Sequence, residues 1–214
     1  RARLELPVVR RLRDAVEGQW GCDLIASWNS AGWIDLPRRV AATLAPLIGA
    51  DADEVLVVDT TSVNLFKLLA AAVAMRPQRR VILSERDNFP TDLYIAQGLN
   101  RWLGGRLELR LVAREAIADA LDEDVAVAML TQVDYRDGSC LDLADVTARA
   151  HRVGALTIWD LAHSAGALPV DLDAARADFA VGCGYKYLNG GPGAPAFLYV
   201  ARRHHDAATQ PLSG

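Results

Sequence analysis

Short apolar runs recur along the chain from residue 55 onward, and they constrain its fold more than any other feature. Most of the runs are continuously apolar, which predicts strands that are buried on both faces of a sheet. Helical patterns lie between several of them, as in SVNLFKLLAAAVAM (62–75) and DLADVTARAHRV (142–153). This alternation predicts an α/β domain with a mainly parallel central sheet flanked by helices. The predicted strands are VLVVD (55–59), VIL (81–83), LELRLV (107–112), VAVAML (125–130), ALTIWD (155–160), DFAVGC (178–183) and AFLYV (196–200).

The composition supports a large core and narrows the possible partners. Of the 214 residues, 51% are hydrophobic, and the net charge of −4 gives no support to a nucleic-acid or anionic-membrane partner. No apolar run approaches the ~20 residues of a membrane span, and no signal peptide is visible. Cys22, Cys140 and Cys183 lie far apart without ligand-like spacing. We therefore expect reduced thiols, no metal site and a cytoplasmic protein.

The first 50 residues differ from the rest. They look helical, and Pro7 suits the start of a helix that carries the apolar residues Val8, Leu12 and Val16. We predict that residues 1–50 form an N-terminal helical segment, part of a small lobe or interface, and that residues 51–214 form the large domain. The chain has no initiator methionine and stops in a turn, so we expect it to be a fragment.

Polar residues gather where the predicted strands end. In open α/β sheets, ligands bind beyond the carboxyl ends of the strands. The four clusters are Asp59–Ser62, Thr131, Asp160–His163 and Tyr185–Lys186. They form one site only if their strands are neighbours.

Each candidate also has an ordinary structural interpretation. Thr61 and Ser62 could cap the helix that follows them, or bind a phosphate group at its start. Asp160 could be a cap or a turn residue, and His163 a structural hydrogen-bonding group. Phe89, placed before a proline, could belong to the core, and Asp92 could be a further cap.

The combination favours a cofactor site. We expect Lys186, at the end of an apolar run, to be buried, which is unusual because desolvating an ammonium is costly. A buried lysine is typical of a nucleophile that must lose its proton. A lysine, an aspartate such as Asp160, an aromatic ring such as Phe89 and a phosphate-binding helix start together hold pyridoxal 5′-phosphate (PLP). Their order suggests a fold type I enzyme.

Five segments together resemble the kynureninase family, along almost the whole chain: SWNSAGWIDLPRR, DTTSVNLFKLL, NFPTDLYIAQGL, WDLAHSAGALPVDL and GYKYLNGGPGAPAFLYV. Related desulfurases and aminotransferases typically have His-Lys or Ser-x-x-Lys where this chain has Tyr185-Lys186. The resemblance implies a fold type I, PLP-dependent homodimer that hydrolyses L-kynurenine, and potentially 3-hydroxykynurenine, to anthranilate and L-alanine. That reaction belongs to tryptophan catabolism, in the kynurenine pathway that leads to NAD biosynthesis.

The resemblance also implies roles for individual residues. Lys186 matches the lysine that binds the cofactor, and Asp160 matches the partner of its pyridinium nitrogen. Phe89 matches the ring stacked on the cofactor. Trp28 lies in a segment that lines the family's substrate pocket. The other matches are the phosphate pair Thr61 and Ser62, the residues beside the cofactor Pro90, Thr91, Asp92, Thr131 and His163, and Tyr185, a phosphate contact and candidate proton relay.

This chain departs from the family in its length, and two rival functions remain. The family's chains are roughly twice as long, so the resemblance implies that cofactor and substrate contacts are missing here and that these residues alone are inactive. One rival is another fold type I activity, such as a cysteine desulfurase, which requires a mobile nucleophilic cysteine. The other is a non-catalytic relic that binds PLP or only a partner.

Overall fold

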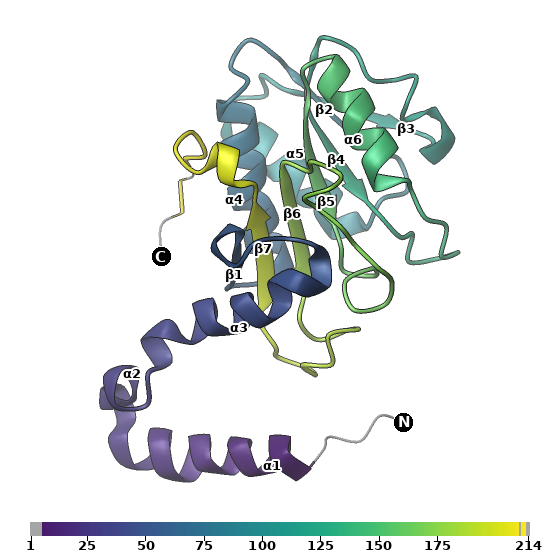
Figure 1. Ribbon diagram of the computed structural model, residues 1–214. Helices are drawn as coiled ribbons and strands as arrows, with labels where there is room; N and C mark the ends of the chain where they lie inside the picture. Colours follow the sequence, from purple (N-terminus) through teal and green to yellow (C-terminus); the bar gives the residue numbers. More distant parts are fainter. Residues whose placement is uncertain (1–5, 210, 213–214) are drawn as a thin grey trace.

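The computed structural model describes residues 6–209 and 211–212, and in them seven strands form one sheet in the order β1-β7-β6-β5-β4-β2-β3 (Figure 1). Strand β7 is antiparallel to both of its neighbours, and the other pairs are parallel. The predicted α/β class with a mainly parallel sheet is therefore confirmed. The strands are β1 (Val55–Val57), β2 (Val81–Glu85), β3 (Glu108–Val112), β4 (Val125–Thr131), β5 (Leu156–Asp160), β6 (Phe179–Cys183) and β7 (Ala196–Val200).

Six α-helices, one π-helix and several 3₁₀ turns accompany the sheet in the described residues. The α-helices are α1 (Leu6–Arg13), α2 (Ser27–Ser30), α3 (Leu36–Leu44), α4 (Thr61–Ala74), α5 (Pro90–Trp102) and α6 (Leu143–Arg152). The segments are the π-helix η1 (Asp14–Asp23) and the 3₁₀ turns η2 (Leu24–Ala26), η3 (Trp33–Asp35), η4 (Ala45–Ile48), η5 (Ala52–Glu54), η6 (Arg114–Ala116) and η7 (Arg202–His204).

Each predicted run coincides with one strand, and the bounds differ where local geometry intervenes. The run at 55–59 is shortened because Asp59 has φ 52°, a left-handed conformation that cannot continue a strand. The run at 81–83 extends to Glu85, because parallel pairing with β3 continues to that residue. Helix α4 begins at Thr61 because Thr60, not Thr61 or Ser62, is the N-cap and accepts a hydrogen bond from the Val63 amide.

The sheet is buried on both faces, which explains its continuously apolar strands. Successive residues of a strand point to opposite faces, so Ile82 and Leu83 lie in different core clusters. The cluster of Ile82 includes Leu65 and Leu68 from α4, together with Leu99 from α5. The opposite cluster is closed by residues of α3 and α6. This packing places helices on both faces of the sheet, as the alternating pattern predicts.

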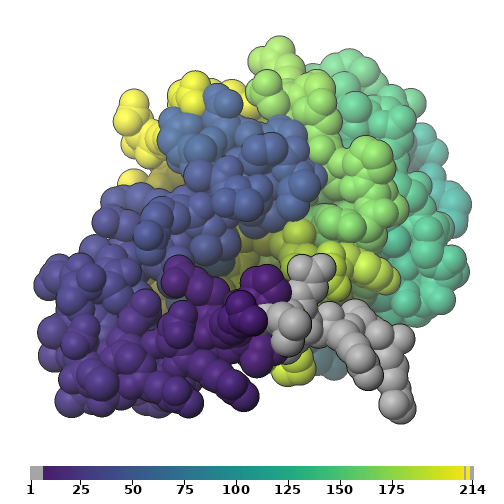
Figure 2. Space-filling model, turned by 60° about the horizontal axis from the view of Figure 1, so that its bottom comes forward, coloured from purple at the N-terminus to yellow at the C-terminus, as the bar shows by residue number. Residues whose placement is uncertain are grey.

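The N-terminal segment divides into an inner and an outer part. Residues from α3 and η4, including the fully buried Ala41 and Ile48, belong to the main core. The helices before them extend away from the sheet and form a separate ridge in the space-filling view (Figures 1 and 2). Val8, Leu12 and Val16 on this ridge are 44%, 54% and 52% exposed. The helical N-terminus is confirmed, whereas a domain boundary at residue 50 stays a prediction.

Candidate functional site

The polar clusters predicted from the sequence follow strands that end at one edge of the sheet. Strands β4, β5 and β6 are parallel neighbours, and β1 runs in the same direction because it pairs with the antiparallel β7. Strand β2, which precedes Phe89, is the parallel neighbour of β4. The carboxyl ends of all five strands therefore lie along the same edge of the sheet. Open α/β sheets bind ligands at this edge.

Lys186 and His163 form the centre of this edge. The Lys186 Nζ lies 2.9 Å from the His163 Nε2. Burial, and then the Lys186 charge, lower the pKa of His163. The other ring nitrogen of His163, Nδ1, is buried without a hydrogen-bond partner. The His163 Nδ1 can therefore still form a hydrogen bond with a ligand.

The expectation that Lys186 is buried is wrong. The side chain is only partly buried, and its two neighbouring tyrosines are exposed. Strand β6 ends at Cys183, so the chain has already left the sheet when it reaches Lys186. The glycine-rich turn that follows needs left-handed backbone at Gly191 (φ 76°) and Gly193 (φ 86°). The lysine is thus presented at the mouth of the site.

Two carboxyl groups lie beneath the lysine. Asp92 is 3% and Asp160 is 6% exposed. Burial, and then the Asp160 carboxylate, raise the pKa of Asp92 to about 8. Burial raises the pKa of Asp160 to about 6, although its Oδ1 accepts a 2.8 Å hydrogen bond from the Ala162 amide. Asp160 is therefore a turn residue as well as a site carboxylate, and Asp92 Oδ2 has no partner.

Aromatic rings surround the lysine. Its Nζ lies 5.8 Å from the ring centroid of Phe89 and 5.7 Å from that of Tyr185. Phe89 is 38% exposed and is not a core residue. Pro90 and Thr91 follow it at the start of α5. Burial raises the pKa of Tyr185, so its hydroxyl stays protonated at neutral pH.

Thr61, Ser62 and Thr131 lie at the strand ends as the sequence indicates. Thr61 and Ser62 are the first two residues of α4, half-buried, at positions whose amides have no partner within a helix. The structure excludes them as the cap, because Thr60 fills that position. The Thr131 hydroxyl donates to the Asn88 Oδ1, and the Asn88 amide donates to the Ser84 hydroxyl. This chain of bonds joins the ends of β2 and β4.

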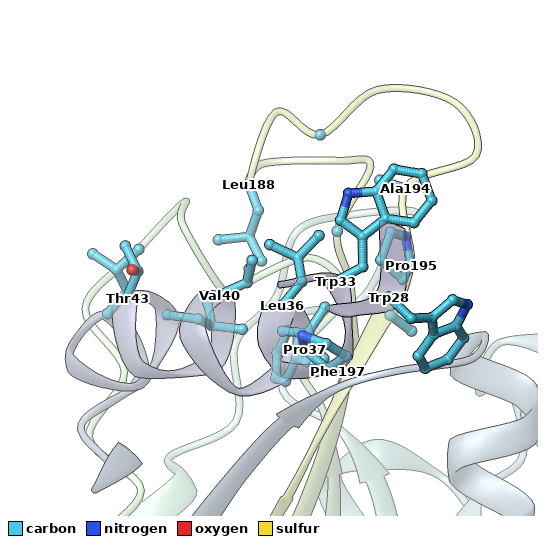
Figure 3. A pocket seen from close by; sticks show the side chains of 16 residues that line it. Trp28, Trp33, Leu36, Pro37, Val40, Thr43, Leu188, Ala194, Pro195 and Phe197 are labelled. Atoms are coloured by element: carbon cyan, nitrogen blue, oxygen red, sulfur yellow. The ribbon is translucent and has the colours of Figure 1, made fainter. Parts of the chain in front are cut away.

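Trp28 lies apart from these polar groups, on an apolar groove of about 870 Å³. The groove separates α3 from the segment after Lys186, and their side chains face one another across it (Figure 3). It reaches the cofactor-side residues through Gly184, two positions before the lysine. The groove therefore adjoins the site without containing its polar residues.

The sequence reasoning missed a loop that encloses the site. Tyr135, just beyond β4, packs edge-on against Phe89 at 5.3 Å and stacks with His163 at 6.4 Å between ring centroids. Arg114 holds this loop by donating to the carbonyls of Gln132 (2.7 Å) and Ser139 (3.0 Å), and it pairs with the buried Glu85. The only available signal was the position of Tyr135, four residues after Thr131.

The described part of the chain holds neither a metal-binding cluster nor a helix that could span a membrane. No group of three or more His, Cys, Asp or Glu residues there could hold a metal ion. No described helix has both the length and the apolar character needed to cross a membrane. All three cysteines are free, and Cys183 is buried.

Comparisons with known proteins identify the family of this chain. The family model described as aminotransferase class-V matches residues 34–214. A kynureninase of Burkholderia mallei is 58% identical over 95% of this chain and 50% of its own length. A kynureninase of Deinococcus radiodurans is 57% identical over 97% of this chain and 51% of its own length.

A solved structure shows the same fold. A C-DES mutant with glycine covalently linked to its PLP cofactor matches with a TM-score of 0.75, covering 98% of this chain and 56% of that one. Its 18% sequence identity supports a likeness of fold alone. This chain spans about half the length of the curated relatives it matches.

Proposed function

Because this chain belongs to the aminotransferase class-V family, we propose that its protein is a PLP-dependent kynureninase that hydrolyses L-kynurenine to anthranilate and L-alanine. The observation that carries the proposal is the 57–58% identity to two kynureninases over almost the whole chain. The site geometry supports it, since the residues that resemble the family's cofactor site lie at one edge of the sheet. Ring-hydroxylated kynurenine is a second candidate substrate.

The residues present fit PLP. Asp92 Oδ2 and His163 Nδ1 are buried at the site without a partner, which is costly unless a ligand supplies one. Lys186 would bind the cofactor covalently, Phe89 would cover its ring, and Asp160 would face its ring nitrogen. Thr61, Ser62 and Tyr185 would bind its phosphate. Bound PLP supplies an electron sink that stabilises negative charge on substrate carbon atoms.

The two carboxyl groups differ in how readily they keep a proton. Burial raises the pKa of both carboxyl groups, and that of Asp92 further, so a proton shared by the two neighbours lies mainly on Asp92. The remaining negative charge, mainly on Asp160, would hold a proton on the ring nitrogen of bound PLP, because a nearby anion raises the pKa of a protonated base.

Lys186 and Tyr185 move protons. The free amine of Lys186 takes the proton from the substrate Cα, and its partly exposed position lets it reach a bound substrate. The Lys186 Nζ lies 5.7 Å from the Tyr185 ring centroid, so the protonated phenol can relay protons near the same atoms. Tyr135 and the groove of Trp28 would limit access of water to the substrate from two sides.

Assembly, location and domain organisation belong to the proposal. The apolar ridge of α1 and η1, exposed at Val8, Leu12 and Val16, supports a homodimer in which a second copy covers it. We assign residues 1–50 to a helical segment at this interface and residues 51–214 to the PLP-binding domain. The net charge of −4 and the free cysteines fit a cytoplasmic enzyme.

The test is product analysis with the purified protein and added PLP. We expect L-kynurenine to yield anthranilate and L-alanine in equal amounts. Release of alanine from L-cysteine but not from L-kynurenine would instead identify a desulfurase. The identity to kynureninases favours the hydrolase over that rival, and Cys183, which is buried and donates to the Ala162 carbonyl, is not a candidate for a mobile nucleophile.

Cofactor binding separates the enzyme from a relic. We expect an absorbance band typical of PLP bound to a lysine, lost on reduction with borohydride, and the reduced cofactor on Lys186 by mass spectrometry. A protein that binds PLP in this way but releases no product from either amino acid would be the non-catalytic relic.

A further inference from the structure

A strained residue stands directly before the helix start that carries Thr61 and Ser62. Asp59 has φ 52°, in the left-handed region that residues other than glycine rarely adopt. Asparagine and aspartate tolerate this region better than other residues except glycine. The conformation of Asp59 therefore carries a reduced energetic cost. Such conformations persist only where the surrounding structure enforces them, and they gather at functional sites.

A buried lysine holds the side chain of Asp59. The Lys67 Nζ lies 2.7 Å from the Asp59 Oδ2. Lys67 belongs to the second turn of α4 and is only 8% exposed, which is rare for lysine unless it is paired. Side chains on a helix lean toward its N-terminus, so Lys67 reaches back to the start of its own helix.

The backbone of the same turn is tied to two other elements. The Asp59 carbonyl accepts a 2.9 Å hydrogen bond from the Ala196 amide, at the start of β7. The Val58 amide donates to the Ala196 carbonyl, and the Asn64 side chain donates to the Val58 carbonyl at 2.8 Å. The turn between β1 and α4 is therefore fixed to the strand that follows the glycine-rich turn of Lys186.

We propose that Asp59 and Lys67 form a positioning pair, which holds the turn so that Thr61 and Ser62 present their amides and hydroxyls to the cofactor phosphate. The pair does not touch the cofactor itself. The inference rests on the PLP assignment made above and adds a role for two residues outside it. The ion pair selects the left-handed conformation at Asp59, and that conformation sets the direction in which α4 begins.

The experiment compares the affinities of the whole apo-protein for PLP and for pyridoxal, which lacks the phosphate. Lys67→Met removes the charge but keeps a long apolar stem. Asp59→Gly removes the carboxylate and lets the backbone adopt the same φ without strain. We expect each variant to bind PLP roughly tenfold more weakly, about the effect of one charge-assisted hydrogen bond. Pyridoxal affinity should stay within twofold.

The double variant and a control separate positioning from other effects. If the pair acts as one unit, Asp59→Gly with Lys67→Met should be little weaker than either single variant. Arg203→Met, which removes an ion pair to Asp178 distant from the phosphate turn, should lower the melting temperature without changing the ratio of PLP to pyridoxal affinity.

Four results would overturn the inference. An unchanged affinity ratio in both variants, whatever their melting temperatures, would make the pair purely structural. Tighter PLP binding by Asp59→Gly would mean that Lys67 acts on the phosphate through its charge and not through the turn. Wild-type protein with no affinity for PLP would overturn the proposed function together with this inference, whereas wild-type affinity in the variants would overturn this inference alone.

Discussion

Buried aspartates occur at both ends of the parallel strands, and they differ in how many hydrogen-bond donors surround them. At the amino end, Asp178 is 1% exposed, and its oxygens accept hydrogen bonds from His204 and Arg203 (both 2.7 Å) and from His151 (2.8 Å). The amide and hydroxyl of Thr157 donate to it as well. At the carboxyl end, the Asp92 Oδ2 has no partner at all.

The pKa values express this contrast. Burial raises the pKa of Asp178, but the hydrogen bonds from His151, His204 and Arg203 outweigh it and bring the pKa well below its ordinary value. Burial raises the pKa of Asp92 to about 8, and too few donors oppose it. A buried carboxyl group with a complete set of donors stabilises the fold, whereas one without them is available to a ligand. The two ends of the sheet thus serve stability and function respectively.

The largest expected effect is at the carboxyl end. Lys186→Ala should reduce turnover of L-kynurenine to the background level, because it removes both the cofactor attachment and the base. The folded protein should be retained, since Lys186 is partly exposed and no core residue depends on it. Steady-state kinetics and circular dichroism measure the two quantities. Turnover within tenfold of wild type would remove Lys186 from the mechanism.

At the amino end the same kind of truncation should destabilise the fold instead. Asp178→Ala should lower the free energy of unfolding by about 3 kcal/mol or more, because it leaves a set of buried donors without an acceptor. The kcat of the molecules that remain folded should be unchanged. Denaturant titration tests this, with Asp145→Ala, which breaks an exposed pair with Arg149, as the control expected to cost about 0.5 kcal/mol. Equal losses in the two variants would contradict the comparison.

Asp160→Asn removes the negative charge of the side chain but keeps its shape, so it should affect kcat and not the stability of the apo-protein. The asparagine oxygen can still accept the hydrogen bond from the Ala162 amide, so the apo-protein should not be destabilised. The charge that holds a proton on the ring nitrogen is lost, and kcat should fall on the order of 10²-fold. A change in kcat below threefold would show that another group protonates the ring.

The smallest effect is a pH dependence of apo-protein stability. The pKa of Asp92 is raised on folding, so its contribution is favourable at low pH and is lost as pH rises from about 4 to about 8. Asp92→Asn should flatten this decline and raise the melting temperature at pH 8 relative to wild type. A loss of stability at pH 8 would show that Asp92 has donors that stabilise its charged form.

Resemblance and pattern together predicted candidate residues that the structure places along one edge of the sheet, and the failures of these predictions have a common cause. Thr131, Asp160 and Lys186 were predicted to lie at one edge because they stand at or just after the ends of predicted strands, and strand direction alone places such residues. Phe89 was predicted from its combination with these groups and from the resemblance. The exposure of Lys186 was misjudged although the predicted strand ends at Cys183, as β6 does, because burial beyond the end of a strand depends on which other elements pack there. Tyr135 and Arg114 were missed, because their partners lie far along the chain.

The amino-acid sequence by itself determined the α/β class, the strands and the candidate residues for the proposed PLP site, since these depend on local periodicity and short motifs. Only the tertiary structure decided which polar groups are satisfied. Nothing in the sequence marks three groups of ionisable residues as unusual: Asp59 with Lys67, Asp92 with Asp160, and Asp178 with its histidines. Their roles come from burial and from partners brought by other elements, because the cost of a buried charge depends on every donor around it.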